Sequence, residues 1–148
     1  MRIEDEIKST FKSEYHKLLV NLKLTSSRLG EGMQASMKEF GLTSTQYNVL
    51  RILRGQKQVP ASVGLIKNRM IERNSDVSRI IDRLLKKELI IRTENKLDRR
   101  QKDVIISDKG LDVLSQIDSK EDQIKELVGH LNKKEVTLLN ELLDKCRK

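Results

Sequence analysis

The sequence predicts a mainly α-helical single domain that carries one small two-stranded β-hairpin. Aromatic residues are only 3% of the 148 residues, so the core must be built from Leu, Ile, Val and Met, and one proline leaves few tight turns. Apolar residues recur at steps of three and four along most of the chain, whereas two short runs, 89–93 and 102–107, are rich in β-branched residues. This length suits one domain and is short for two.

The N-terminal segment predicts two helices. Apolar side chains at helical spacing between Ile3 and Leu29 predict one long helix that ends near Gly30. Residues 31–40 predict a short second helix, which Gly41 would stop.

Two further helices are expected in the middle of the chain. Thr43 and Gln46 form a capping-box pattern, so a helix should start at Thr43 and close at Gly55. Residues 60–72 predict a short helix, because a proline and a serine at its start are typical of a helix N-terminus.

The strongest periodic segment follows. Its apolar stripe consists of Val77, Ile80, Ile81, Leu84 and Leu85. The polar residues outside that stripe are Ser75, Ser78, Arg79, Asp82, Arg83 and Lys86. Asn74 or Ser75 is the expected N-cap. The pattern predicts a helix with one dry face and one basic, hydroxyl-rich face.

The C-terminal part of the chain predicts a hairpin and two helices. The two β-branched runs would pair as a hairpin with a long basic tip between them. Ser107 or Asp108 can cap a helix in which apolar residues between 111 and 131 form a stripe over about six turns. Asn132 and Glu135 form a second capping-box pattern and predict a last helix.

Composition argues against several classes of protein. The apolar runs are far shorter than the roughly 20 residues that cross a bilayer, and the N-terminus is acidic where a signal peptide is basic, so we expect a cytoplasmic protein. Cys146 is the single cysteine, and His16 and His130 lie far from it in sequence, so we expect no metal centre, disulfide or cofactor. Without a Gly-rich phosphate loop or a nucleophile motif, we expect no enzyme.

The net charge of +8 is unevenly distributed. It is +4 over residues 1–59 (10 basic, 6 acidic), +5 over 60–110 (13 and 8) and −1 over 111–148 (7 and 8). This placement favours polyanion binding by the first two-thirds of the chain and a structural role for the last third.

The order helix, short helix, basic helix and basic hairpin matches a helix-turn-helix followed by a wing. The stretches LTSTQYNVLRIL and NSDVSRIIDRLLKKELIIRTENKLDRRQKDVIISDKG resemble the multiple-antibiotic-resistance repressor (MarR) family of winged helix-turn-helix regulators. The most specific part is Asp98 and Arg100 followed by Ser107 and Gly110, which match the family pattern D-x-R, six residues, S/T, x, x, G. The resemblance covers residues 42–110.

The resemblance implies a domain organisation and a function. Residues 42–110 would form the winged helix-turn-helix DNA-binding region, and residues 1–30 and 111–148 would be dimerisation helices. The protein would be a sequence-specific regulator that binds double-stranded DNA as a homodimer at a pseudo-palindromic operator. Repression is the family's commoner mode, and a small amphipathic or phenolic effector would release the repressor.

Site residues follow from the resemblance and from the placement of charge. The expected DNA-binding residues are Asn74, Ser75, Asp76, Ser78, Arg79, Arg83, Lys96, Arg99, Arg100 and Lys102. Asp98 would order the wing by pairing with a nearby arginine. The resemblance implies an effector pocket between the dimerisation helices and the winged domain, with candidate lining residues Tyr15, His16, Met37, Phe40 and Tyr47.

Three points stay open in the sequence. Asp76 could accept a hydrogen bond from a cytosine amino group, but a helix-N-terminal Asp more often caps its own helix. Glu88 stands where many family members have Gly, so it either adopts a left-handed conformation at a cost of about 1 kcal/mol or the helix ends differently. The alternative function is a winged-helix protein-interaction module without specific DNA binding. The basic and hydroxyl residues on both the recognition helix and the wing argue for DNA.

The basic hairpin tip provides a first test of DNA binding. If the tip enters the minor groove, Arg100→Ala should weaken operator binding by about 1 kcal/mol or more per contact and flatten the slope of log K against log[salt] by roughly 0.9 for each lost phosphate contact. Asp98→Ala should also weaken binding if Asp98 orders the loop, although removing an acid near DNA should by itself strengthen binding. Titrations of one operator fragment across salt concentrations measure both effects. Tighter binding by Asp98→Ala, with no loss for Arg100→Ala, would show that the tip is only a charged surface.

Overall fold

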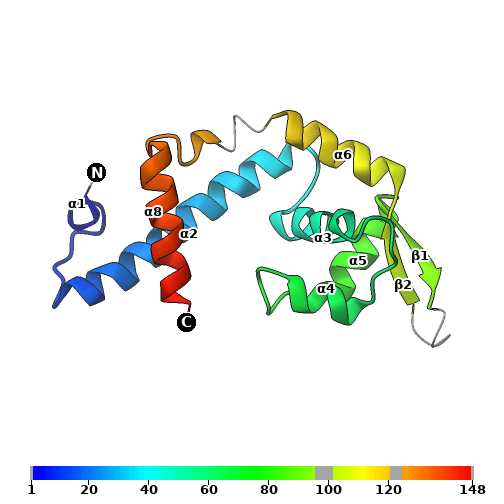
Figure 1. The fold of residues 1–148 in the computed structure, drawn as a ribbon, viewed down its shortest axis with the longest axis horizontal. Helices are drawn as coiled ribbons and strands as arrows, with labels where there is room; N and C mark the ends of the chain where they lie inside the picture. The colour runs from blue at the N-terminus through cyan, green and yellow to red at the C-terminus, as the bar shows by residue number, and fades with distance from the viewer. Residues whose placement is uncertain (1, 96–101, 121–124, 148) are drawn as a thin grey trace.

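The chain consists of a long helical arm with a folded body at one end (Figure 1). The structure is a computed structural model, and it describes residues 2–95, 102–120 and 125–147. The helices are α1 (Ile3–Ile7), α2 (Glu14–Lys38), α3 (Ser44–Gly55), α4 (Val63–Arg69), α5 (Val77–Lys86), α6 (Asp108–Ser119) and α8 (Lys133–Cys146), and the strands are β1 (Ile90–Glu94) and β2 (Lys102–Ile106). The expected fold class, mainly helical with one two-stranded hairpin, is confirmed.

One hydrophobic core holds the body together. α3 is its central element and contacts α2, α4, α5, α6 and β2. The largest fully buried side chains are Met37, Leu50, Leu53, Ile66, Leu84, Leu114, Ile117, Val49 and Val104. Each fully buried side chain of this size contributes about 1.5–3 kcal/mol relative to exposure, so this cluster fixes how the helices of the body sit against one another. Leucine, isoleucine, valine and methionine supply most of it, as the composition predicted.

The hairpin is confirmed, with β1 and β2 paired antiparallel from Ile90 opposite Ile106 to Glu94 opposite Lys102. Ala61, just before α4, exchanges two backbone hydrogen bonds of 2.9 Å with Val104 on the other side of β2. The chain before α4 is therefore tied to the hairpin.

The predicted capping box of α3 is also confirmed. The Thr43 hydroxyl accepts from the Gln46 N–H at 3.1 Å, and the Gln46 side chain accepts from the Thr43 N–H at 3.1 Å.

The prediction of one long N-terminal helix ending near Gly30 and a short second helix over 31–40 is wrong. α1 ends at Ile7, and the residue after it, Lys8, is left-handed (φ 49°). A new helix begins after Ser13, whose side chain accepts from the His16 N–H at 3.2 Å. Ser and Thr around this break compete with helical hydrogen bonding, so a cap forms there instead of a continuous helix. α2 then continues through Gly30 to Lys38, because an exposed helical glycine costs only about 1 kcal/mol.

Ion pairs hold α1 against α2. The Lys17 ammonium lies 2.6 Å from the Glu4 carboxylate, and Arg28 lies 3.1 Å from Glu6. The hydrogen bond from Lys17 lowers the pKa of the Glu4 carboxyl. Ile3 is buried in this contact, so the short first helix folds back along the arm.

The expected stripe of six helical turns between residues 111 and 131 is also wrong. α6 begins at its predicted cap, with the Ser107 hydroxyl accepting from the Gly110 N–H at 3.0 Å, but it ends at Ser119. Ile117 is its last buried residue, so the core provides no apolar contact that would extend the helix. The capping box of the last helix is confirmed by Asn132 and Glu135.

The end of α5 joins the helix to the hairpin through a left-handed residue. Glu88 has a φ of 61°, and its N–H donates to the Leu85 carbonyl at 2.9 Å. The Leu89 N–H donates to the Leu84 carbonyl at 3.1 Å, which completes a Schellman C-cap. The Ser107 hydroxyl donates to the Glu88 carbonyl at 2.7 Å and so fixes this strained residue. Of the two outcomes expected for Glu88, the left-handed one is found.

Gly110 lets α6 pack closely against this junction. A Cβ on Gly110 would overlap the Leu89 carbonyl oxygen and would lie 2.8 Å from Cγ1 of Ile106. Ser107 donates its own N–H to the Leu89 carbonyl at 3.1 Å. In the S/T-x-x-G pattern, the serine is therefore the N-cap of α6, and the glycine is the position at which α6 packs against the backbone of Leu89. We refer to Glu88, Leu89, Ser107 and Gly110 together as the junction.

Gly110→Ala should therefore destabilise the protein by about 1–3 kcal/mol or more, since overpacking against backbone cannot be relieved by a side-chain rotation. Gly64→Ala is the matched control, because the atom nearest to its new Cβ is Ser62 Oγ at 3.8 Å, and it should be neutral or stabilising. Urea unfolding of both variants measures the free energies. Equal stability of Gly110→Ala and the wild-type protein would contradict the close packing at the junction.

Candidate nucleic-acid interface

α4, the turn after it and α5 form the helix-turn-helix unit of the body. Val77, Ile81 and Leu84 bury one face of α5 in the core, as predicted. The opposite face is exposed and carries Ser78, Arg79, Asp82, Arg83 and Lys86. Because the buried stripe fixes the rotation of the helix, these polar side chains lie outside the core and remain open to solvent.

The N-cap of α5 is Asp76, so the prediction of Asn74 or Ser75 is wrong. The Asp76 carboxylate accepts from the Arg79 N–H at 3.1 Å. Ser75 instead donates its N–H to the Glu72 carbonyl, which places residues 74 and 75 in the turn before the helix. The choice that the sequence left open for Asp76 is settled for the free protein, where its carboxylate caps its own helix.

Arg79 and Arg83 are the arginines of this face. Within the described part of the chain, neither Arg79 nor Arg83 takes part in an ion pair. Asp82 differs, because its carboxylate lies 2.7 Å from the Arg92 guanidinium of β1. This pair neutralises an acid on the α5 face and ties the helix to the hairpin. Sequence reasoning missed it because the two residues are ten positions apart on different elements.

The hairpin tip can be placed only in part. Lys102 begins β2, is exposed, and lies 3.8 Å from Glu94 across the hairpin. The other expected wing residues, Lys96, Asp98, Arg99 and Arg100, lie outside the described residues.

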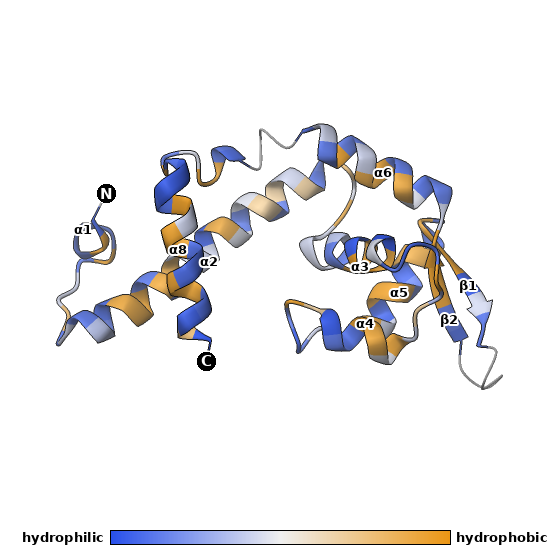
Figure 2. Cartoon of the chain, viewed as in Figure 1, coloured by the Kyte–Doolittle hydropathy of each residue, from blue (hydrophilic) through white to orange (hydrophobic). Residues whose placement is uncertain are grey.

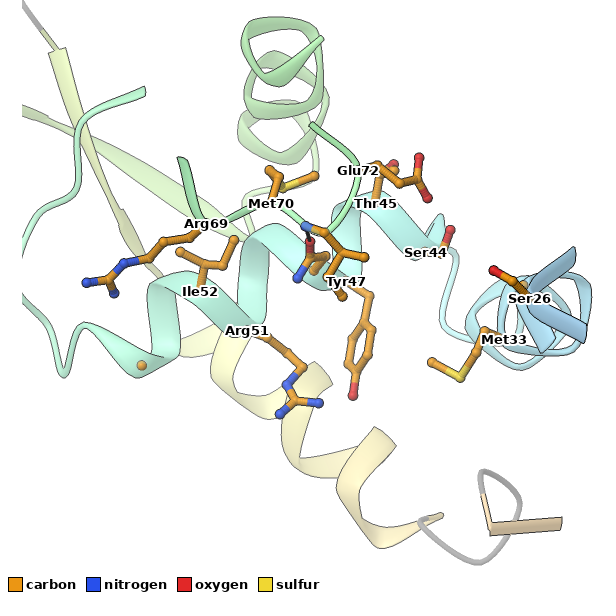
Figure 3. A pocket seen from close by; sticks show the side chains of 14 residues that line it. Ser26, Met33, Ser44, Thr45, Tyr47, Arg51, Ile52, Arg69, Met70 and Glu72 are labelled. Atoms are coloured by element: carbon orange, nitrogen blue, oxygen red, sulfur yellow. Dashed lines mark hydrogen bonds between the residues drawn. The ribbon is translucent and has the colours of Figure 1, made fainter. Parts of the chain in front are cut away.

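A hollow of about 800 Å³ lies between α2, α3 and the segment that follows α4, as Figure 3 shows. It is lined by Ser26, Gly30, Met33, Ser44, Thr45, Tyr47, Asn48, Arg51, Ile52, Gly55, Arg69, Met70, Ile71 and Glu72. The Arg51 guanidinium lies 5.8 Å from the centre of the Tyr47 ring. We call this space the interhelical pocket. Its lining combines apolar side chains with two arginines, Arg51 and Arg69, and one acid, Glu72.

Of the residues expected to line an effector pocket, the structure brings only Tyr47 to the interhelical pocket. Met37 is buried in the core, and Phe40 lies under the Lys120 ammonium at 5.2 Å. Tyr15 and His16 lie in the first turn of α2, and the His16 ring contacts the ring of Phe11. The search for aromatic, Met and His residues missed Arg51, although its position four residues after Tyr47 puts both on one helix face.

One segment of chain connects the interhelical pocket to the start of α5. Met70, Ile71 and Glu72 line the interhelical pocket and lead directly into the turn before α5. The Ile71 N–H donates to the Asn48 side chain at 3.0 Å, which ties this segment to α3. A molecule in the pocket would therefore touch the chain that positions the start of α5.

The sequence model of the MarR family matches residues 42–102, which run from α3 through α5 to the hairpin. This segment of the chain is therefore similar to the MarR family. Among the chain's relatives is the HTH-type transcriptional regulator MhqR of Bacillus subtilis, 27% identical over 128 residues that cover 86% of this chain and 87% of MhqR.

Solved structures of MarR proteins share the fold. A mutant MarR of E. coli, solved in complex with operator DNA, is 22% identical and superposes with a TM-score of 0.78 over 93% of this chain and 99% of that one. BpsR of Bordetella bronchiseptica, whose DNA binding is regulated by 6-hydroxynicotinic acid, is 23% identical with a TM-score of 0.77 over 89% of this chain and 99% of that one. MhqR is thus a transcriptional regulator by name, and the E. coli and B. bronchiseptica proteins both bind DNA.

Two other kinds of feature are absent from the part of the chain that the structure describes. No described helix combines the length and the apolar character needed to cross a membrane. Among residues 2–95, 102–120 and 125–147, no group of three or more His, Cys, Asp or Glu side chains could hold a metal ion.

The capping role of Asp76 leads to a stability prediction. Asp76→Ala should lower the free energy of unfolding by about 1 kcal/mol, whereas Asp76→Asn should have little effect because Asn caps helices as well as Asp. Urea unfolding of the two variants is the measurement. Full stability of Asp76→Ala would mean that the carboxylate is not needed as a cap.

Proposed function

We propose that this protein is a MarR-family regulator that binds double-stranded DNA sequence-specifically and acts in the cytoplasm as a homodimer. The observation that carries the proposal is the exposed face of α5, a helix anchored in the core, where Arg79 and Arg83 pair with no acid among the described residues. An α-helix fits the major groove, and arginine pairs with guanine edges and with phosphates. The role is non-catalytic.

The DNA-binding residues are proposed on the same basis. Asn74, Ser75, Ser78, Arg79 and Arg83 lie in the turn before α5 or on its exposed face and would face bases and phosphates. Asp76 would mainly position the helix start. The wing residues Lys96, Arg99, Arg100 and Lys102 would approach the minor groove, with Asp98 ordering the tip. Residues 42–110, which form most of the body, are thus the proposed DNA-binding region.

Homodimer formation is proposed from apolar surface outside the body. In the single chain α8 has no buried residue, although Val136, Leu138, Leu139 and Leu142 are all at least 36% exposed. α2 likewise exposes Leu18 and Leu19, and Figure 2 shows apolar stretches on both helices outside the body. A second copy would cover this surface, so residues 1–30 and 111–148 are proposed as dimerisation segments. Two-fold symmetry then calls for a pseudo-palindromic operator.

We also propose that the interhelical pocket takes a small amphipathic effector, of which a phenolic anion is one type. Arg51 and Arg69 would attract a carboxylate or phenolate, while Met33, Tyr47 and Ile52 would contact its apolar part. Binding would act on the segment leading to α5 and release the DNA, which makes the regulator a repressor wherever its operator overlaps a promoter. A protein-interaction module without DNA binding is the alternative, and it gives no reason for unpaired arginines on α5.

Arg79→Ala should weaken operator binding by about 1–3 kcal/mol and relax the preference at one base pair if Arg79 contacts a base. An equal loss on operator and random duplex would instead assign Arg79 to a phosphate. The control is Arg147→Ala, which removes the same charge near the C-terminus. Titrations of a selected operator and a random duplex measure both quantities. Unchanged affinity for both DNAs would reject either contact.

Introducing charge into α8 tests the dimer. Leu139→Lys together with Leu142→Lys should shift the protein towards monomer, because a buried unpaired lysine is costly. Val59→Lys is the control, since Val59 is 60% exposed in the loop before α4 and lies outside the proposed interface. Sedimentation at micromolar concentration is the measurement. A well-folded wild-type monomer under these conditions would refute the dimer.

A further inference from the structure

A second hollow, of about 590 Å³, lies where α2 ends, α3 begins and α5 ends. It is lined by Gln34, Lys38, Gly41, Leu42, Thr43, Gln46, Arg83, Lys86 and Lys87. Four of these residues are basic and none is acidic. We call this space the basic hollow.

No described acidic residue neutralises the positive charge of the basic hollow. Among the described residues none of Lys38, Arg83, Lys86 and Lys87 forms an ion pair. Other lysines of the body do, for example Lys120 with Glu39 at 2.7 Å. Four cations around one concave surface repel each other, so an anion placed among them would gain from all four.

Lys87 is held at the edge of the hollow by neutral acceptors. Its ammonium donates to the Gly41 carbonyl and to the Gln46 side-chain oxygen, the latter at 3.4 Å. Gln46 itself is only 4% exposed, and its side-chain oxygen also accepts from the Thr43 N–H. The lysine is thus held in place by neutral acceptors and not by an acidic partner among the described residues.

Neither the start of α3 nor the dipole of α5 accounts for this cluster. At the start of α3 the Ser44 N–H already donates to Gln34 at 3.0 Å, so the hollow depends on side-chain cations and not on free helix N–H groups. Lysines in the last turn of α5 would complement the helix dipole. That explanation covers Lys86 but not Lys38, which comes from α2.

We propose that the basic hollow binds backbone phosphates of duplex DNA beyond the bases that α5 contacts, an inference that rests on the proposed DNA-binding function. Arg79, Arg83 and Lys86 are spaced four and three residues apart and lie on one stripe of α5. The basic hollow continues this stripe beyond the C-terminal end of the helix. Charge complementarity and continuity with the α5 face therefore both favour DNA as the occupant.

The dimensions agree with this placement. α5 has ten residues, which corresponds to a length of roughly 15 Å, and the major groove is about 12 Å wide. If the start of α5 lies at base edges, its far end reaches the border of the groove, where the phosphates run. Lys38 and Lys87 widen the contact there. Contacts of this kind strengthen binding to every sequence equally.

The test uses a double variant, Lys38→Gln with Lys86→Gln, in the full-length dimer. Both side chains are exposed, so the fold should be kept, which a urea melt checks. Lys133→Gln with Lys134→Gln is the control, because it removes the same charge on exposed residues at the start of α8, before the apolar residues of the proposed dimer interface, which begin at Val136. Sedimentation checks that this control stays a dimer. All three proteins are titrated with an operator duplex and a random duplex across salt concentrations.

The double variant should bind both duplexes at least about tenfold more weakly at low salt, by the same factor for each. The slope of log K against log[salt] should fall by up to roughly 3.6, which is 0.9 for each of about four phosphates per dimer. The control variant should match the wild-type protein.

A separate titration with inorganic pyrophosphate distinguishes DNA from a free anion. If pyrophosphate raises the melting temperature of the wild-type protein but not of the double variant, while DNA binding is equal, the hollow is a small-anion site and the proposal is overturned. Unchanged affinity and slope on both duplexes overturn it as well and leave the proposed function standing. If the wild-type protein binds neither duplex, both the proposed function and this inference are rejected.

Discussion

The orientation of α5 relative to the hairpin and to α6 is fixed at the junction. The left-handed Glu88 turns the chain out of α5, its carbonyl accepts the Ser107 hydroxyl at 2.7 Å, and Leu89 lies against Gly110. One serine therefore holds the end of one helix while it caps the start of another. Since a non-glycine residue in this conformation costs about 1 kcal/mol, the contacts around it have to offset that strain. The proposed DNA-binding surface depends on this constraint, because it has to present a helix and a hairpin at a fixed angle.

The two sides of α5 have different tasks. Its buried side joins the core through Val77, Ile81 and Leu84, and its exposed side carries cations that nothing in the described chain neutralises. The Asp82–Arg92 pair lies between them and links the helix to β1. At the start of α5, the preceding segment lines the interhelical pocket, so occupancy of the pocket and the position of the helix are physically connected. The proposed control by an effector rests on this connection.

Local signals in the sequence predicted most of the body. The capping pattern of Thr43 and Gln46, the serine cap of α6 and the stripe of α5 each depend on residues within one or two turns, and the structure contains all of them. The family pattern ending in Ser107 and Gly110 also has a local physical basis at the junction. These features are short-range, so a single sequence is enough to identify them.

Sequence reasoning missed two kinds of feature: helix ends at which a local cap competes with a continuing helix, and sites that bring together residues far apart in the sequence. The break after α1 arises because Ser13 caps a new helix within an apolar stripe that would otherwise continue, and the glycines of α2 are too weak to end it. The interhelical pocket brings together residues from α2, α3 and the turn before α5, so a search by residue type selected Tyr15 and His16 and overlooked Arg51. Lys38 and Lys86 lie 48 positions apart and meet only in the folded chain.

The central claim, that α5 occupies the major groove in each half of a dimer, is tested most directly by methylation interference. An operator selected from a random duplex pool is methylated at guanine N7, which lies in the major groove, and the bound and free fractions are compared. The account predicts interference at two clusters of guanines related by two-fold symmetry, separated by about one helical turn or a multiple of it. Interference in a single cluster, or binding that is indifferent to N7 methylation throughout the site, would contradict it.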